Sequence, residues 1–224
     1  MKIEIVTLFP EMFVGPFGES IVKRALVKNL VQITTFDLRK WALDKRGTVD
    51  DRPYGGGTGM LLRPEPIFAA IEEIRDNKLK SKVVLLDAGG ESYNQKRAMD
   101  YSKLDQLILI CGHYEGVDYR VHKHLADDVI SVGDFVVTGG EIPAMLVADS
   151  VVRLIPGVLE KEDATVIESF TKKGLLEYPQ YTRPEVYQDY KVPEVLLSGN
   201  HAKIDSWRKE SSIKRTMTNR PDLT

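Results

Sequence analysis

The segment Ile130–Met145, which reads ISVGDFVVTGGEIPAM, joins an apolar run to a pair of glycines and the start of an apolar helix. The run Val129–Val137 predicts a buried strand. Residues Glu141–Ile155 predict a helix, with Pro143 near its start, where a missing N–H costs little. This helix is apolar on nearly every side, which is typical of a helix that is buried all round. In a domain this small, a subunit interface could supply part of that cover.

Strand-like and helix-like segments also alternate on the N-terminal side of this stretch. Short apolar runs predict further strands over Ile3–Phe9, Val31–Leu38, Lys82–Leu86 and Gln106–Cys111. Apolar residues at helical spacing predict helices over Ser20–Leu30 and Ile67–Leu79. Strands that alternate with helices indicate an α/β fold, with a mostly parallel sheet covered on both faces.

Three glycine-bearing loops follow predicted strands. They are Leu86–Gly90, Gly112–Gly116 and the residues between Ser131 and Glu141. The carboxyl ends of parallel strands are where α/β proteins bind ligands, and glycines let the backbone approach a planar adenine or a ribose. For any one loop, a tight turn between strand and helix is the simpler interpretation. Three such loops, with Tyr114 and Glu115 among them, favour a binding pocket.

Other nucleotide and metal signatures are missing from the sequence. It has no GxxxxGK[ST] loop and no GxGxxG after the first strand. One cysteine and four scattered histidines show no metal-ligand spacing, so we predict no metal site. His122 and His124 are two residues apart and would diverge on a helix, so we expect both at the surface.

The segment Val49–Met60, which reads VDDRPYGGGTGM, has an unusual density of glycine. Each glycine loses extra chain entropy when it is ordered, so the segment would make a poor structural element. One interpretation is a flexible surface loop. The other is a loop that becomes ordered on a ligand, with Asp50, Asp51 and Arg52 making polar contacts to it.

The composition excludes several classes of protein. The chain has 224 residues, 42% hydrophobic and 29% charged, and a formal net charge of −2. A general DNA-coating protein would usually be basic, so any nucleic-acid site must be a local patch that suits one structured RNA. No apolar run is long enough to cross a bilayer, and the N-terminus lacks the features of a signal peptide. The single cysteine, Cys111, excludes an internal disulfide and fits the cytoplasm.

The C-terminal third changes in character after Pro156-Gly157, which ends the apolar helix. We expect one domain over residues 1–157, a polar and mobile linker over 158–173, and a small helical domain over 174–224.

Basic residues surround Trp207 in this last part: Lys203, Arg208, Lys209, Lys214, Arg215 and Arg220. They form either a solvated helix face or a surface for RNA, whose phosphates and unstacked bases need cations and aromatic rings. We take Lys209, Lys214 and Arg215 as candidate phosphate contacts.

The whole series of motifs resembles the bacterial tRNA (guanine-N1)-methyltransferases, TrmD, of the SPOUT class. The matching stretches are FPEMF (9–13), TVDDRPYGGGTGM (48–60), CGHYEGVDYRV (111–121), ISVGDFVVTGGEIPAM (130–145), RLIPGVL (153–159), GLLEYPQYTRPEV (174–186) and LLSGNHAKIDSWR (196–208). The resemblance implies a SPOUT fold, with a deep trefoil knot in the C-terminal half of the sheet. It also implies a homodimer with shared active sites. The reaction would be methyl transfer from S-adenosylmethionine to N1 of the guanine at position 37 of tRNA, just 3′ of the anticodon.

The resemblance also implies roles for individual residues. Glu115 matches a carboxylate near the cofactor and the target guanine, Arg153 an arginine that orients the guanine, and Glu168 the catalytic base. Asp50, Asp51 and Arg52 fall on the loop that engages tRNA. The cofactor positions are Leu86, Gly90, Gly112, Tyr114, Ser131, Val132, Gly133, Phe135, Val137, Gly139 and Gly140.

The chain departs from the family pattern at two places. It has Glu168-Ser169-Phe170 where the family has Asp-Ser-Phe, and Ala88-Gly89-Gly90 where the family has Pro-Gln-Gly. A divalent cation is associated with the family, but no ligand cluster in this sequence places one. The alternatives are a non-catalytic RNA-binding module, which would not explain three cofactor loops, and another SPOUT methyltransferase with a different RNA target.

Overall fold

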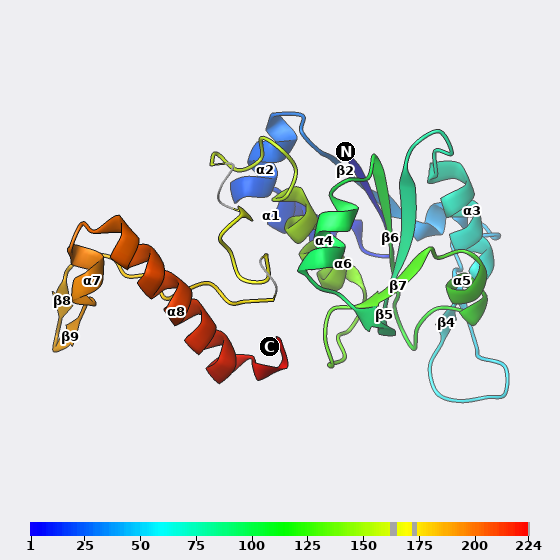
Figure 1. The fold of residues 1–224 in the computed structure, drawn as a ribbon. Helices are drawn as coiled ribbons and strands as arrows, with labels where there is room; N and C mark the ends of the chain where they lie inside the picture. Colours follow the sequence, from blue (N-terminus) through cyan, green and yellow to red (C-terminus); the bar gives the residue numbers. More distant parts are fainter. Residues whose placement is uncertain (162–164, 172–173, 224) are drawn as a thin grey trace. The chain divides into compact units, whose positions relative to one another are not determined.

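The computed structural model describes residues 1–161, 165–171 and 174–223, and it divides into two compact units, Met1–Glu160 and Lys161–Thr224 (Figure 1). A five-stranded parallel sheet in the order β2-β1-β6-β5-β7 forms the centre of the first unit. Its strands are β1 (Lys2–Thr7), β2 (Gln32–Asp37), β5 (Ser81–Ser92), β6 (Gln106–Cys111) and β7 (Asp128–Ser131). The predicted α/β fold with a mostly parallel sheet is confirmed.

Both faces of this sheet are buried, because its central strands are apolar at consecutive positions. On β6, Leu107 and Leu109 face one core cluster, whereas Ile108 and Ile110 face the other. Successive side chains of a strand point to opposite faces, so an unbroken apolar run is what a sheet covered on both sides requires.

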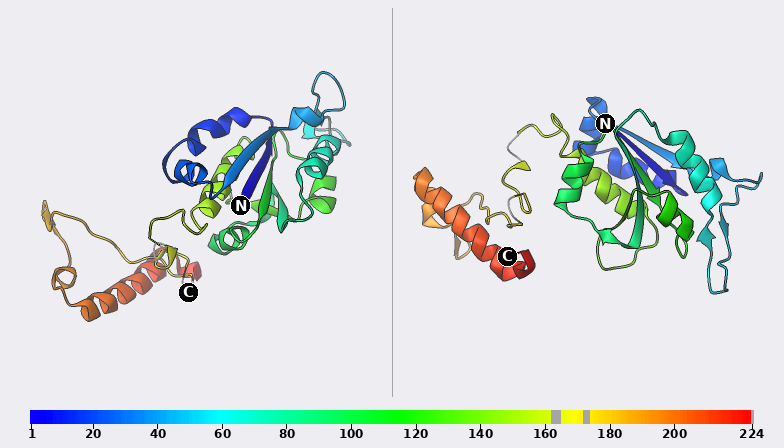
Figure 2. Two further views of the ribbon diagram at one scale, coloured as in Figure 1. Left: turned by 90° about the horizontal axis from the view of Figure 1, so that it is seen from above. Right: turned by 45° about the vertical axis from the view of Figure 1, so that its right-hand side comes forward.

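Helices cover the two faces (Figures 1 and 2). Residues of α1 (Val14–Phe17), α2 (Ser20–Val27), α4 (Gln95–Tyr101) and α6 (Glu141–Val152) pack into the first cluster. Residues of α3 (Pro64–Ile74) and α5 (Tyr119–His124) pack into the second, with the 3-10 helix η2 (Leu38–Trp41). The 3-10 helix η1 (Pro10–Phe13) follows β1. This arrangement leaves the carboxyl ends of the strands to the connecting loops.

Two strands differ by more than two residues from their predicted extents. The predicted strand Val129–Val137 ends at Ser131, because the following apolar residues leave the sheet, and Val136 is exposed. Conversely, β5 continues past Leu86 as far as Ser92. Both Leu86 and Glu91 pair with Ile130, so the intervening predicted loop is an irregularity within a strand.

The helix boundaries also shift, for local reasons. The helix predicted over Ser20–Leu30 ends at Val27, shortly before Asn29, whose φ is 55°. The helix predicted over Ile67–Leu79 begins earlier, at Pro64, and ends at Ile74. The predicted helix Glu141–Ile155 ends at Val152, in line with the bias against helix just before Pro156.

The second unit is built on α8 (His201–Asn219), which lies within the small helical domain predicted over 174–224. The Asn200 side chain caps it by accepting a 3.1 Å hydrogen bond from the Lys203 backbone N–H. Thr216 is fully buried, and its Oγ1 accepts a 2.9 Å hydrogen bond from the Leu176 backbone N–H. The unit also contains β8 (Val186–Tyr187), β9 (Tyr190–Lys191), α7 (Glu194–Leu197) and η4 (Pro221–Leu223).

Across the described ranges, no helix combines the length and the apolar character that a membrane span needs.

Candidate cofactor and catalytic site

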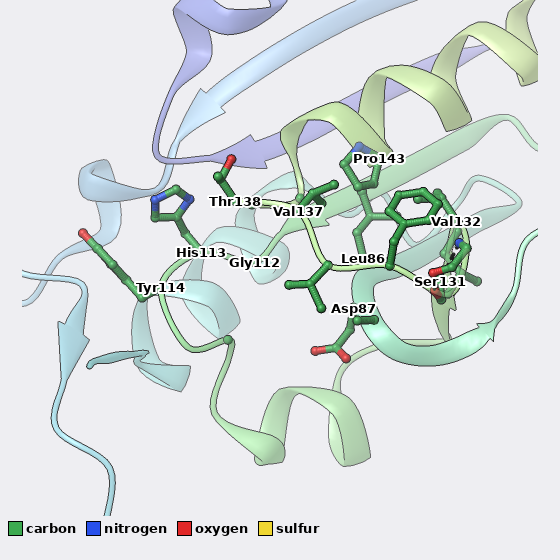
Figure 3. Close-up of a pocket in the computed structure, with 18 of the residues that line it drawn as sticks. Leu86, Asp87, Gly112, His113, Tyr114, Ser131, Val132, Val137, Thr138 and Pro143 are labelled. Carbon is green, nitrogen blue, oxygen red and sulfur yellow. Dashed lines mark hydrogen bonds between the residues drawn. The ribbon is translucent and has the colours of Figure 1, made fainter. Parts of the chain in front are cut away.

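A cavity of about 200 Å³ lies at the carboxyl ends of β5, β6 and β7 (Figure 3). Its walls come from three parts of the chain: Leu86–Ala88 in β5, Gly112–Gly116 after β6, and Ile130–Gly140 around and after β7. Pro143 in the first turn of α6 completes the lining. The three predicted glycine loops therefore meet at one site, as the carboxyl ends of parallel strands should.

The predicted cofactor residues lie together, with one difference. All of them except Gly90 line the cavity, and so does Glu115. Gly90 packs against the neighbouring strand, where a Cβ would lie 2.5 Å from the backbone nitrogen of Ile130. The structure therefore gives Gly90 a packing role in the sheet.

Close backbone contact between two loops shapes one wall of the cavity. The Gly140 backbone N–H donates a 2.8 Å hydrogen bond to the Gly112 carbonyl, and His113 forms a bridge with Gly139. A Cβ on Gly140 would lie 2.7 Å from the Cα of Cys111, so only glycine allows this approach. Tyr114 adopts a φ of 59°, an uncommon conformation for a residue with a side chain.

A buried carboxylate, which sequence reasoning missed, lies beneath this wall. Glu141 is 2% exposed, and its Oε1 accepts a 2.7 Å hydrogen bond from the Thr7 hydroxyl. Its Oε2 lies 3.9 Å from Nδ1 of His113, a cavity-lining residue. Burial and the nearby Glu141 charge both raise the pKa of the Cys111 thiol well above its usual range. In sequence, Glu141 is an ordinary acid in a first helical turn, so no local signal distinguishes it.

Asp87 is a second missed residue, and it also lines the cavity. Its Oδ2 lies 3.1 Å from Nε2 of His122, on α5. The prediction that His122 is a surface residue is wrong, because its side chain is only 16% exposed. His124, by contrast, is exposed as predicted. The pair joins positions 35 residues apart, so only the fold brings them together.

The glycine-rich segment forms a hairpin beside the cavity. Strand β3 (Asp50–Asp51) pairs with β4 (Leu61–Leu62), and the residues between them make the loop. The Glu115 backbone N–H donates a 3.0 Å hydrogen bond to the Met60 carbonyl. A Cβ on Gly59 would overlap the Glu115 side chain. The base of the candidate tRNA loop is therefore attached to a cavity-lining residue.

The other two predicted catalytic residues are not in this cavity. Arg153 follows the last residue of α6, about 15 Å along the helix from Pro143 at 1.5 Å per residue. Glu168 belongs to the second unit, where it lines a separate cavity of about 380 Å³ with Tyr178 and Arg208. Of the predicted site residues, the first cavity therefore holds Glu115 and every cofactor position except Gly90, but neither Arg153 nor Glu168.

The basic C-terminal residues differ in their surroundings. Lys209 and Lys214 are exposed on α8, whereas the Arg215 guanidinium donates a 3.0 Å hydrogen bond to the Glu177 carbonyl. The Arg208 guanidinium lies 4.9 Å from the ring centroid of Tyr178. This face therefore combines cations with aromatic rings. Among the described residues, no group of acidic, histidine or cysteine side chains has the arrangement of a metal site.

A parallel sheet with a glycine-lined cavity at its strand ends defines an α/β protein with a small-molecule site. The family model described as tRNA (Guanine-1)-methyltransferase TrmD matches residues 1–224. The chain is 53% identical over 224 residues to the tRNA (guanine-N(1)-)-methyltransferase of Dehalococcoides mccartyi (strain CBDB1), covering 100% of this chain and 90% of that protein. It is also 53% identical over 224 residues to the Bacillus subtilis (strain 168) protein of the same name, covering 100% of this chain and 92% of that protein. The chain therefore belongs to the tRNA (guanine-1)-methyltransferase family TrmD and is a methyltransferase.

Proposed function

We propose that this enzyme transfers a methyl group from S-adenosylmethionine to N1 of guanine 37 in tRNA, in the cytoplasm. The observation that supports the proposal most directly is the cavity itself. Cofactor positions that the family resemblance predicted in three separate loops face one space at the ends of β5, β6 and β7.

The cavity has the chemistry that such a donor requires. Gly112, Gly139 and Gly140 bring backbone close to the space, and Leu86, Ile130, Val132 and Val137 give it apolar walls suited to an adenine ring. Asp87 and Glu115 supply negative charge, which suits a ligand that carries an ammonium group and a sulfonium. When bound, S-adenosylmethionine supplies a methyl group on a positively charged sulfur.

The protein must then manage the proton on guanine N1, because the neutral N1–H is a poor nucleophile. We assign this step to the Glu168 carboxylate, which accepts the proton as N1 forms its new bond to carbon. A positioned carboxylate contributes about 10²–10⁴-fold to such a step. Glu115 lies beside the donor cavity, where it can contact the guanine once that base leaves the anticodon-loop stack.

We further propose that a second copy of the chain completes the site. Arg153 lies at the opposite end of α6 from the cavity, so a guanine held at the cavity of one chain needs the Arg153 of another. On α6, Ile142 is 54% exposed and Leu146 is 46% exposed, which provides an apolar surface for that copy. The close contact of Gly140 with Gly112 supports the knotted SPOUT topology that we propose for this half of the sheet.

The proposed tRNA contacts lie on both units. Asp50, Asp51 and Arg52 are at the base of the hairpin attached to Glu115, so RNA bound there would lie near the donor cavity. Exposed Lys209 and Lys214 suit phosphates.

The proposal is tested by single-turnover methylation of a tRNA transcript, with the modified nucleotide mapped by mass spectrometry. The parent should place one methyl group on N1 of guanine 37. Glu168→Gln keeps the shape of the side chain but removes its basicity, so the rate should fall about 10²–10⁴-fold while cofactor and tRNA binding stay intact. Glu168→Asp should keep substantial activity.

Glu185→Gln, an exposed acid of the same unit, is the matched control and should leave the rate unchanged. A Glu168→Gln rate within a few-fold of the parent would show that another group takes the proton. Methylation at a different nucleotide would refute the assigned target.

A further inference from the structure

The carboxylate of Asp87 is held in one orientation at the edge of the donor cavity. Its Oδ1 accepts a 2.7 Å hydrogen bond from the Gly89 backbone N–H, and its Oδ2 lies 3.1 Å from Nε2 of His122. Both oxygens are thus engaged by groups outside the cavity. Asp87 nevertheless lines the cavity, and Figure 3 shows it among the residues drawn around this pocket. Its side chain is 29% exposed.

The surroundings of His122 favour the tautomer that carries its proton on Nε2. The Tyr119 ring stacks on the imidazole, with 5.2 Å between centroids and an angle of 23° between planes. Nδ1 is buried and has no hydrogen-bond partner in the part of the chain that the structure describes. A proton on Nδ1 would leave a buried and unpaired N–H, which is unfavourable. Nε2–H therefore donates to Asp87, and the carboxylate keeps its negative charge.

That charge is not balanced within the cavity. Of the lining residues that the structure describes, Asp87 and Glu115 are acidic, and none is a lysine or arginine. Asp118 also interacts with His122, and this acid is engaged by the Arg120 guanidinium at 2.8 Å. The cavity therefore presents a fixed negative charge to its ligand.

We propose that Asp87, positioned by His122, makes the cavity distinguish the positively charged methyl donor from its neutral thioether product. The proposal rests on the function proposed above, because it takes S-adenosylmethionine as the ligand. Methyl transfer breaks the sulfur–carbon bond and leaves the electron pair on sulfur, so the ligand loses one positive charge at that atom. Its ammonium and carboxylate groups are unchanged. A carboxylate in a partly covered site therefore attracts the donor more than the product.

The test compares dissociation constants for S-adenosylmethionine and S-adenosylhomocysteine by calorimetry, in the full-length protein. Asp87→Asn keeps the size of the side chain but removes its charge. It should lower the preference for the donor over the product about tenfold, mainly by weakening donor binding. His122→Gln retains an N–H donor and should stay near the parent value, whereas His122→Leu should reduce the preference. A loss of folded protein would lower the apparent affinity for both ligands alike. The ratio of the two dissociation constants therefore reports the effect of the charge.

Asp134→Asn is the control for general charge, since Asp134 lies between Gly133 and Phe135 in sequence but does not line the cavity. The proposal predicts no change in the ratio for this variant. An unchanged ratio of dissociation constants in Asp87→Asn, or an equal change in Asp134→Asn, would refute the proposed role of Asp87 but would leave the proposed function standing. If the parent protein bound neither ligand, the proposed function itself would fail.

Discussion

Replacing Gly90 with alanine should destabilise the first unit strongly, although Gly90 does not line the cavity. A Cβ there would lie 2.5, 2.6 and 2.7 Å from the backbone N, C and Cα of Ile130. Favourable contacts between carbon atoms are about 3.5–4.0 Å, so one strand must move by about 1 Å. Overpacking of this kind costs about 1–3 kcal/mol, and we expect about 3 kcal/mol because backbone rather than a side chain must yield. For a chain of this size, that corresponds to a fall of about 6–12 °C in Tm.

Gly89→Ala is the matched control, because a Cβ at that position meets only Oδ1 of Asp87, at 3.2 Å. The assay is urea unfolding followed by tryptophan fluorescence in a Trp207→Phe background, so that Trp41 reports on the first unit alone. Gly89→Ala should change the free energy of unfolding by less than about 1 kcal/mol. Equal stabilities for the Gly89 and Gly90 variants would refute the packing argument and return Gly90 to the list of binding candidates.

Two further predictions concern charge. Replacing Lys209, Lys214 and Arg215 together with alanine should reduce the slope of log affinity for tRNA against log salt by about 0.7–0.9 per lost phosphate contact, without altering cofactor affinity; an unaltered slope would mean that this face is only solvated. Burial raises the pKa of Asp128, but hydrogen bonds from Lys82 and Tyr101, with nearby positive charge, hold it below its ordinary 3.8. The ionised Asp128 carboxylate therefore stabilises the folded state above pH 3.8, and this contribution is lost as the pH falls through the lower pKa of the folded state. In acid unfolding experiments, the free energy of unfolding of Asp128→Asn should depend less on pH than that of the parent.

The sequence predicted the layered fold because strand β6 and its neighbours carry unbroken apolar runs. It did not predict where β5 ends. Strand β5 continues beyond Leu86 because its residues pair with Ile130, which is more than 40 residues away from Leu86 in sequence. The continuation also requires Gly90, which is small enough to pack directly against the Ile130 backbone. Neither property can be read from local spacing. Local spacing also explains why Val132–Val137 was predicted as strand. Apolar residues that line a cavity and apolar residues inside a sheet have the same local sequence pattern, so the sequence does not distinguish them.

The candidate site was predictable where its residues belong to motifs, and not where it depends on packing. Gly139 and Gly140 stand in a recognisable loop, and they line the cavity. Asp87 and His122 gave no signal, because a polar residue in a turn and a histidine in a helix are ordinary. The position of Arg153, one helix away from the cavity, follows only from the length and direction of α6.

The single thiol, Cys111, is 2% exposed at the end of β6, and its pKa is raised by burial and by Glu141. Since the thiolate is the reactive form, the folded chain offers almost no target for alkylating reagents. Two practical properties follow from this placement. A cysteine introduced on the surface can carry a fluorophore or spin label without background from the native residue. Loss of structure around β6 exposes the Cys111 thiol, which is unreactive in the folded chain. The rate at which this thiol is alkylated therefore reports on unfolding of the native protein.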